Sequence, residues 1–233
     1  LNAKLIPMHA QISGFRAVKE DWELDNMRKA QAITDKAFAE MCTRIKAGMT
    51  EKELQAELIY CLYKNGATGL AFDPIVVSGP NTSLPHGVAG ERRIQEGDFI
   101  TMDFGALYNG YCADMTRTVA VGYATEEMKK VYDTVLKAQL AGIAAAKAGL
   151  PGKVVDNTAR KVIEDAGYGE YFGHGLGHSV GNNGNLTAKD SIRGTCSEAL
   201  FYALSGDVAF GTLVEDKETL ACVAAEVSRI VGS

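Results

Sequence analysis

The sequence feature that most constrains the fold is a short turn, Asn109-Gly110, flanked on both sides by segments with apolar residues at alternate positions. Asn-Gly strongly favours the two-residue turn of a β-hairpin, because both turn positions need a positive φ. A turn at these two positions fixes the strand register and places Asp103 opposite Thr116. The flanking segments are therefore predicted to pair as antiparallel strands over residues 98–105 and 112–121.

This register sorts the hairpin side chains onto two faces. The expected core face is apolar and carries Ile100, Met102, Phe104, Met115 and Val119. The other face carries Asp103 and Asp114 as diagonal neighbours, about 7–8 Å apart at the backbone. Two converging carboxylates repel each other unless they are protonated or bridged by cations, and hard divalent ions would relieve that repulsion. The alternative is a pair of ordinary strand acids that cap turns or face solvent.

Two of the four histidines lie in one glycine-rich segment, where His174 and His178 are separated by Gly-Leu-Gly. The alternating glycines argue against a helix and favour a tight strand or loop in which the backbone passes close to a ligand. Neutral imidazole there could complete a coordination sphere begun by the aspartates. The alternative is a glycine loop with two exposed histidines.

A third histidine, His86, follows Pro85 in a loop predicted over residues 81–90. A histidine on a loop stiffened by proline can donate a proton or stabilise an oxyanion. A solvent-exposed loop histidine without a role is the alternative. His9 has no supporting context, and no function is assigned to it.

The remaining periodicity predicts helices around this hairpin. Thr50 and Glu53 form a capping box at the start of one of them. The predicted helices cover residues 21–46, 50–64, 125–147 and 154–166, and one further strand covers residues 71–78. The order of elements indicates an α+β domain made of two similar halves.

Composition excludes several classes of protein. The 233 residues are 46% hydrophobic, enough for a sizeable core, and the net charge of −5 argues against nucleic-acid binding. No apolar run is long enough for a membrane span, and no secretory signal is visible. The five scattered cysteines argue against a disulfide framework or a structural zinc site. A reducing, cytoplasmic setting is therefore expected.

Taken in order, the motifs resemble those of the metallopeptidases with the pita-bread fold. Each motif is weak alone, but their order and separations are specific. The motifs are Leu84-Pro85-His86-Gly87, Met102-Asp103-Phe104-Gly105, Ala113-Asp114-Met115-Thr116-Arg117-Thr118 and His174-Gly175-Leu176-Gly177-His178. The last motif resembles Xaa-Pro dipeptidases and aminopeptidases P rather than methionine aminopeptidases. The resemblance implies two similar halves of curved antiparallel sheet covered by helices.

The resemblance covers residues 18–181 and implies a domain division. The opening segment is similar to the connector that follows the N-terminal domain of those enzymes. Residues 1–18 are therefore expected to be a linker remnant, and residues 19–233 the catalytic domain. A homodimer is a further expectation, because related enzymes often dimerise.

The resemblance also implies a site with two divalent metal ions, manganese, cobalt or zinc. Asp103 would bind one ion, Asp114 would bridge both, and His178 would be the single histidine ligand. His86 would stabilise the oxyanion or assist the leaving nitrogen, and His174 would lie on the substrate side. The implied substrates are short peptides with proline at the second position.

Beyond Gly181 the sequence departs from the family pattern. The family has a His-Glu pair seven residues past the ligand histidine, whereas residues 182–185 here are Asn-Asn-Gly-Asn. Glu198 and Glu215 stand near the places of two glutamate ligands and are predicted to serve as such. Residues 182–233 are accordingly expected to be divergent and this part of the fold incomplete.

Three functions follow from these patterns. The leading one is an Xaa-Pro metallo-aminopeptidase or dipeptidase whose activity is impaired by the altered tail. The second is a catalytically inactive pita-bread module that binds a peptide or protein partner. Among enzymes, the alternative is a methionine aminopeptidase, which would cleave Met-Ala rather than Ala-Pro or Gly-Pro.

Overall fold

The computed structural model describes residues 18–147, 150–173 and 175–177 of the chain. These residues form helices and two three-stranded antiparallel sheets, which confirms the α+β prediction. The elements in chain order are α2 (Asp21–Cys42), α3 (Glu51–Lys64), β1 (Gly69–Leu70), β2 (Ile75–Ser78), the 3-10 helix η1 (Gly79–Ser83), β3 (Phe99–Phe104), β4 (Ala106–Tyr108), β5 (Tyr111–Cys112), β6 (Met115–Ala120), α4 (Glu126–Ala145), α5 (Gly152–Asp165) and the 3-10 helix η2 (Gly169–Tyr171).

The hairpin has the turn and the register that the sequence predicts. Asn109 and Gly110 adopt φ values of 48° and 86°, which is the left-handed backbone of a two-residue turn. Tyr108 pairs with Tyr111 directly beside the turn. Farther along the same arms, Asp103 pairs with Thr116. The local chemistry of the turn therefore sets the positions of side chains several residues away.

The hairpin is not continuous, however, because it is shared between two sheets. Its outer part joins sheet β1-β4-β5, and its inner part joins sheet β2-β3-β6. The break falls at Gly105 on one arm and at Ala113-Asp114 on the other. A Cβ atom on Gly105 would lie 1.8 Å from the carbonyl oxygen of Ala113, so only glycine permits this crossing. The strand predicted over 98–105 is confirmed as β3, whereas the strand predicted over 112–121 is wrong at residues 113–114, where it divides into β5 and β6.

The single strand predicted over residues 71–78 is also divided. The structure has Gly69–Leu70 and Ile75–Ser78 instead. The first pairs with β4 and the second with β3, so the chain passes from one sheet to the other between them. Pro74 lies in that passage, where its missing N–H interrupts no ladder.

The predicted helices are present, with shifts at their ends. The capping box of α3 is confirmed, since the Glu53 N–H donates to Thr50 Oγ1 at 3.1 Å and the Thr50 N–H donates to Glu53 Oε2 at 2.7 Å. Helix α2 ends at Cys42 rather than at Lys46. The hydroxyl of Thr43 donates to the carbonyl of Glu40 at 2.7 Å and so competes with continuation of the helix.

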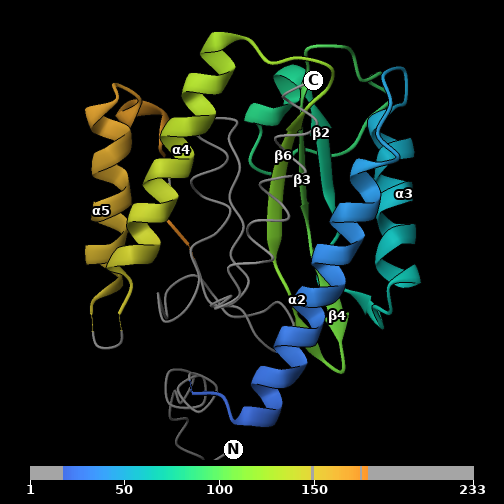
Figure 1. Cartoon of the computed structure of the whole chain (residues 1–233), viewed down its shortest axis with the longest axis horizontal. Coiled ribbons are helices and arrows are strands. Elements are labelled where there is room, and N and C mark those ends of the chain that lie inside the picture. The colour runs from blue at the N-terminus through green and yellow to red at the C-terminus, as the bar shows by residue number, and fades with distance from the viewer. Residues whose placement is uncertain (1–17, 148–149, 174, 178–233) are drawn as a thin grey trace, which may run out of the picture.

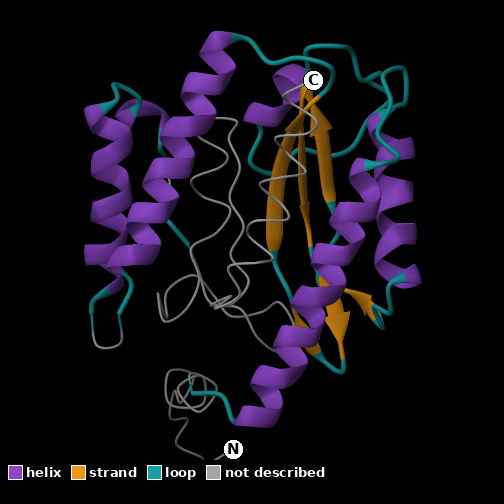
Figure 2. Cartoon of the chain, in the orientation of Figure 1, coloured by secondary structure: helices purple, strands orange, loops and turns teal. Residues whose placement is uncertain are grey.

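The apolar face of the hairpin packs on α2 and α3, as the sequence predicts. Figures 1 and 2 show these two helices lying along one side of sheet β2-β3-β6. Phe38 of α2 and Phe104 of β3 meet with ring centroids 6.4 Å apart. The sheet residues of this buried cluster include Val76, Ile100, Met102, Phe104, Met115 and Val119. Burial of each large side chain stabilises the fold by about 1.5–3 kcal/mol relative to exposure.

Helices α4 and α5 form a second buried cluster. They lie side by side on the other side of the sheet from α2 and α3 (Figure 1). Their shared core is completed by Phe172 and Leu176, which follow α5 in the chain, and contains Val135, Ala138, Val155, Ala159 and Ile163. Within the described part of the chain, no helix combines the length and apolar character needed to cross a membrane.

Candidate active site

The two aspartates of the hairpin lie buried on the face of the sheet opposite the α2–α3 core. Asp103 is in β3 and is 1% exposed, and Asp114 directly precedes β6 and is 5% exposed. In the observed register Asp103 faces Thr116, two residues beyond Asp114. Asp103 is thus fixed by the ladder on this face, and Asp114 directly precedes Met115, which pairs with Phe104 on the core side. That the two carboxylates converge stays a prediction.

Neutral polar groups dominate this face. The positions that alternate with the core residues on β3 and β6 include Thr101, Thr116 and Thr118, all at most 2% exposed. The hydroxyls of Thr101 and Thr118 are 3.4 Å apart. Arg117, the basic residue of β6, pairs with Met102 and so belongs to the opposite, core face.

The chemistry of these donors fits a hard divalent cation. Buried carboxylate oxygens are the ligands that Mg²⁺, Ca²⁺ and Mn²⁺ prefer, and a cation would offset the repulsion between Asp103 and Asp114. Among residues 18–147, 150–173 and 175–177, no three histidine, cysteine, aspartate or glutamate side chains converge as a metal-binding group. The predicted histidine ligand, His178, lies outside the described residues, as do His174, Glu198 and Glu215.

His86 occupies a tight turn at the edge of the same face. The Gly87 N–H donates to the Leu84 carbonyl at 3.2 Å, which closes a turn with Pro85 and His86 at its centre. The His86 side chain is exposed. A Cβ atom on Gly87 would lie 2.7 Å from Val77 Cγ1, so the turn is pressed closely against β2.

The pairing of β2 with β3 shows on which face of the sheet this turn lies. Val77 pairs with Thr101, and Ile75 pairs with Asp103. Residues paired across an antiparallel ladder share a face, so Val77 lies on the carboxylate side of the sheet. The turn carrying His86 therefore packs on the face that also holds Asp103 and Asp114. The roles assigned to these three residues stay predictions.

Two residues that the sequence did not single out hold the backbone on either side of position 174. Arg160 Nη1 donates to the carbonyl of Phe172 at 2.8 Å, and its guanidinium stacks 4.1 Å from the Phe172 ring centroid. Asp156 Oδ1 accepts the N–H of Leu176 at 2.7 Å. The two side chains also pair with each other on α5 at 2.9 Å. Their spacing of four residues is the only local sequence signal for this arrangement.

Comparison with known proteins agrees with this geometry. Residues 25–197 match the family model described as metallopeptidase family M24. The chain belongs to metallopeptidase family M24. It is 44% identical over 170 residues to an Xaa-Pro dipeptidase of Pyrococcus furiosus, covering 73% of this chain and 49% of that one. The M24 chain thus spans about half the length of the curated relatives it matches.

Solved structures of the family share the fold. The X-Pro aminopeptidase of Thermotoga maritima is 45% identical with a TM-score of 0.74, over 78% of this chain and 52% of that one. The prolidase of Pyrococcus furiosus is 43% identical with a TM-score of 0.71, over 73% and 51%. The predicted family and its pita-bread fold are confirmed. Membership in a metallopeptidase family implies a divalent metal cofactor.

The family match also refines where the sequence departs from its relatives. It ends at residue 197, beyond the Gly181 at which the recognisable motifs stop. Glu198 and Glu215 lie past that end. Their assignment as metal ligands therefore rests on the sequence resemblance alone.

Proposed function

We propose that this M24 protein is a metal-dependent peptidase that hydrolyses the bond preceding proline in short Xaa-Pro peptides. The observation that carries the proposal is the pair of buried carboxylates, Asp103 and Asp114, on the face that also carries the His86 turn. The names of its relatives, Xaa-Pro dipeptidase and X-Pro aminopeptidase, support the substrate class. Residues 19–233 would form the catalytic domain after a linker over residues 1–18.

The proposed site holds two divalent ions, with manganese, cobalt and zinc as candidates. Asp103 would bind one ion and Asp114 would bridge both, with His178, Glu198 and Glu215 as the remaining ligands. Such ions supply Lewis acidity, which polarises the scissile carbonyl and makes water a stronger nucleophile. Burial of the two aspartates favours this role, because a low-dielectric site strengthens the attraction between carboxylates and cations.

The histidines would act on the substrate. His86 lies on a closed turn with its side chain exposed to solvent. There it would donate a hydrogen bond to the developing oxyanion or a proton to the leaving nitrogen. His174 would lie on the substrate side of the site. We also propose a homodimer in a reducing, cytoplasmic setting.

A catalytically inactive peptide-binding module is the second candidate. It is favoured by residues 182–185, which read Asn-Asn-Gly-Asn where the family pattern has its His-Glu segment. The methionine aminopeptidase alternative is disfavoured because the similar proteins are an Xaa-Pro dipeptidase and an X-Pro aminopeptidase.

Metal content and substrate choice test the proposal together. Purified, metal-free protein is mixed with Mn²⁺ or Co²⁺, bound metal per chain is measured, and hydrolysis of Ala-Pro, Gly-Pro and Met-Ala is followed. Stoichiometric metal with cleavage of the proline peptides is expected. Cleavage of Met-Ala alone would indicate the methionine aminopeptidase, and a folded protein with neither metal nor turnover would indicate the inactive module.

Substitution of the bridging ligand gives a sharper result. Asp114→Asn is expected to lower bound metal to less than about a tenth of the wild-type amount, because a neutral amide is a poor replacement for an anionic bridge. Asp25→Asn is the matched control, since the Asp25 side chain is 62% exposed on α2. Unchanged metal content in Asp114→Asn would remove the central assignment.

A further inference from the structure

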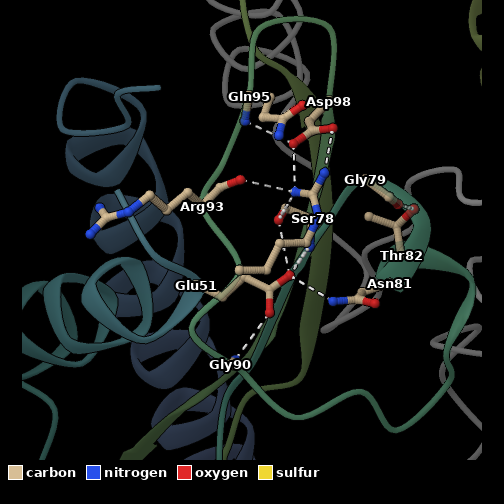
Figure 3. A network of polar contacts seen from close by, with 10 residues as sticks. Glu51, Ser78, Gly79, Asn81, Thr82, Gly90, Arg93, Gln95 and Asp98 are labelled. Carbon is tan, nitrogen blue, oxygen red and sulfur yellow. Dashed lines mark hydrogen bonds and ion pairs between the residues drawn. The ribbon is translucent and has the colours of Figure 1, made fainter. Parts of the chain in front are cut away.

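The loop that carries His86 begins and ends beside one buried carboxylate. The chain leaves β2 at Ser78, forms η1 and the His86 turn, and returns at Gly90 to the start of α3. Glu51 is the first residue of α3 and is 1% exposed. It therefore lies where the two ends of this loop come together (Figure 3).

Both oxygens of Glu51 are engaged by the loop. Oε1 accepts three hydrogen bonds, from the Ser78 N–H at 2.8 Å, the Ser78 hydroxyl at 2.9 Å and Asn81 Nδ2 at 3.1 Å. Oε2 accepts the N–H of Gly90 at 3.0 Å. One oxygen thus holds the beginning of the loop and the other holds its end, as Figure 3 shows.

Backbone contacts fix the returning end as well. The Lys52 N–H donates to the Gly90 carbonyl at 3.2 Å, so both polar groups of Gly90 bind the first turn of α3. The Glu51 N–H donates to the Arg92 carbonyl at 3.1 Å. The start of α3 is consequently a fixed support for Glu51, and the Thr50 capping box holds that support in place.

The Arg92–Asp98 ion pair contacts the Glu51 carboxylate through the Ser78 hydroxyl. Arg92 Nη1 donates to Ser78 Oγ at 2.6 Å and to Asp98 Oδ2 at 2.6 Å, while Arg92 Nη2 reaches Asp98 Oδ1 at 3.0 Å. The Ser78 hydroxyl, which accepts from Arg92, donates in turn to Glu51. The hydrogen bond with Asp98 and the nearby charges of Asp98 and Glu51 raise the pKa of Arg92.

The ion pair has room only because residue 79 is glycine. Gly79 has a φ of 52°, and a Cβ atom on it would lie 2.4 Å from Arg92 Nη2. The sequence thus supplies a small residue at the point where the loop starts to turn away from the sheet.

We propose that Glu51 is a positioning residue, which fixes the His86 loop by binding both of its ends with one carboxylate. The proposal rests on the proposed function, in which His86 acts on the substrate. A carboxylate is required because both of its oxygens accept hydrogen bonds. The amide of a glutamine has one accepting oxygen and would turn an NH₂ group toward donors at one of the two ends.

Glu51→Gln tests the proposal, with Glu53→Gln as the matched control. Glu53 is exposed on the same turn of α3 and accepts the Thr50 N–H, a bond that the amide oxygen of glutamine can keep. This control therefore removes a carboxylate charge from the first turn of α3 and leaves the capping box and the loop contacts in place. Amide hydrogen exchange over residues 79–90 is expected to accelerate about tenfold in Glu51→Gln, because local opening becomes easier. Exchange over β3 is expected to stay at the wild-type rate in both variants.

Kinetics give a second readout on Xaa-Pro peptides. Glu51→Gln is expected to lower kcat about 10- to 100-fold while KM changes less than about twofold, since a misplaced catalytic group chiefly affects the transition state. In a His86→Ala background the same substitution should have almost no further effect, because the group it positions is gone. The amount of metal bound per chain should equal that of the wild type in each of these variants.

Two results would overturn the proposal: wild-type exchange over residues 79–90 in Glu51→Gln, or an equal acceleration in Glu53→Gln. If Glu51→Gln does not fold, Asn81→Ala removes one donor at the loop start and should accelerate exchange over the same residues. If the wild-type chain cleaves no Xaa-Pro peptide, the proposed function fails. The exchange results then decide alone whether Glu51 anchors the loop.

Discussion

The Arg92–Asp98 pair beside the sheet and the Arg160–Asp156 pair on α5 both hold backbone near a histidine position. Their exposure is almost the same, with side chains 25% and 12% exposed in the first and 27% and 14% in the second. The two pairs differ in how they contact the segment that precedes or contains the histidine. The first pair reaches the start of the His86 loop through Ser78 and the buried Glu51. The second pair binds the Phe172 carbonyl and the Leu176 N–H directly.

This difference separates two ways of fixing a loop. Glu51 joins segments that only the tertiary fold brings together, and it is inaccessible to water. Asp156 and Arg160 lie one turn apart on the same helix and reach a segment that soon follows it. Exposed ion pairs stabilise little, while a buried carboxylate leaves costly unsatisfied donors when it is removed. We therefore expect the loss of Glu51 to cost more than the loss of the contacts at Phe172 and Leu176.

The largest expected effect is on stability in Glu51→Ala. This change removes the acceptor for the buried N–H of Ser78 and for the part-buried Gly90 N–H and Asn81 amide. Unfolding free energy is expected to fall by about 3 kcal/mol, measured by urea denaturation. Lys52→Ala, whose exposed side chain pairs with Glu91, is the control and should cost less than about 0.5 kcal/mol.

Asp156→Ala should have a smaller effect. It removes the acceptor for the Leu176 N–H and the partner of Arg160, both of which are part-buried contacts. The expected loss is about 1–1.5 kcal/mol in the same denaturation experiment. A loss as large as that of Glu51→Ala would break the distinction between the two anchors.

The pH dependence of stability sharpens the comparison further. Burial raises the pKa of Asp98, but the hydrogen bonds from Arg92 and from the Gln95 N–H, with the Arg92 charge, outweigh it and leave the pKa below its ordinary value of 3.8. The unfolded chain therefore binds the proton more readily. The stabilisation is complete above the unfolded pKa and disappears as the pH falls through the folded one.

Asp98→Asn tests this by removing the group that titrates. Its urea midpoint should be lower than that of the wild type at pH 7, and the difference should shrink as the pH falls below about 4. The expected difference at pH 7 is about 1 kcal/mol. A difference that is constant from pH 7 to pH 3 would show that Asp98 contributes by packing rather than by charge.

The smallest effect is expected for Arg160→Lys. Lysine keeps the charge beside Asp156 but loses the planar stacking on Phe172 and the forked hydrogen bonds. A loss of about 0.5 kcal/mol is expected. A loss above that of Asp156→Ala would mean that the stacking, and not the ion pair, holds this segment.

The sequence predicts those parts of the site that depend on local chemistry. The Asn109-Gly110 turn sets the register, and the register pairs Asp103 with Thr116 as predicted. The broken hairpin is not predictable in the same way, because the clash that excludes a side chain at Gly105 comes from the opposite arm.

Glu51 shows a second limit of prediction from sequence. An acidic residue after Thr50 is expected in any helix for its interaction with the helix dipole, so nothing local marks it as buried. Its partners Ser78, Asn81 and Gly90 are 27, 30 and 39 residues away. The sequence gives no signal for contacts at that separation, whereas it locates His86 through the adjacent proline and glycine.

The bend at Gly105 restricts how the hairpin can change in length. Its tip, from Ala106 to Cys112, lies beyond the crossing and pairs with β1, away from the carboxylates. One added residue on a single arm would shift the register and turn Asp114 toward the α2–α3 core. Equal additions to both arms would leave the aspartates where they are. The hairpin can therefore be lengthened at its tip, or accept an inserted peptide there, provided that both arms gain the same number of residues.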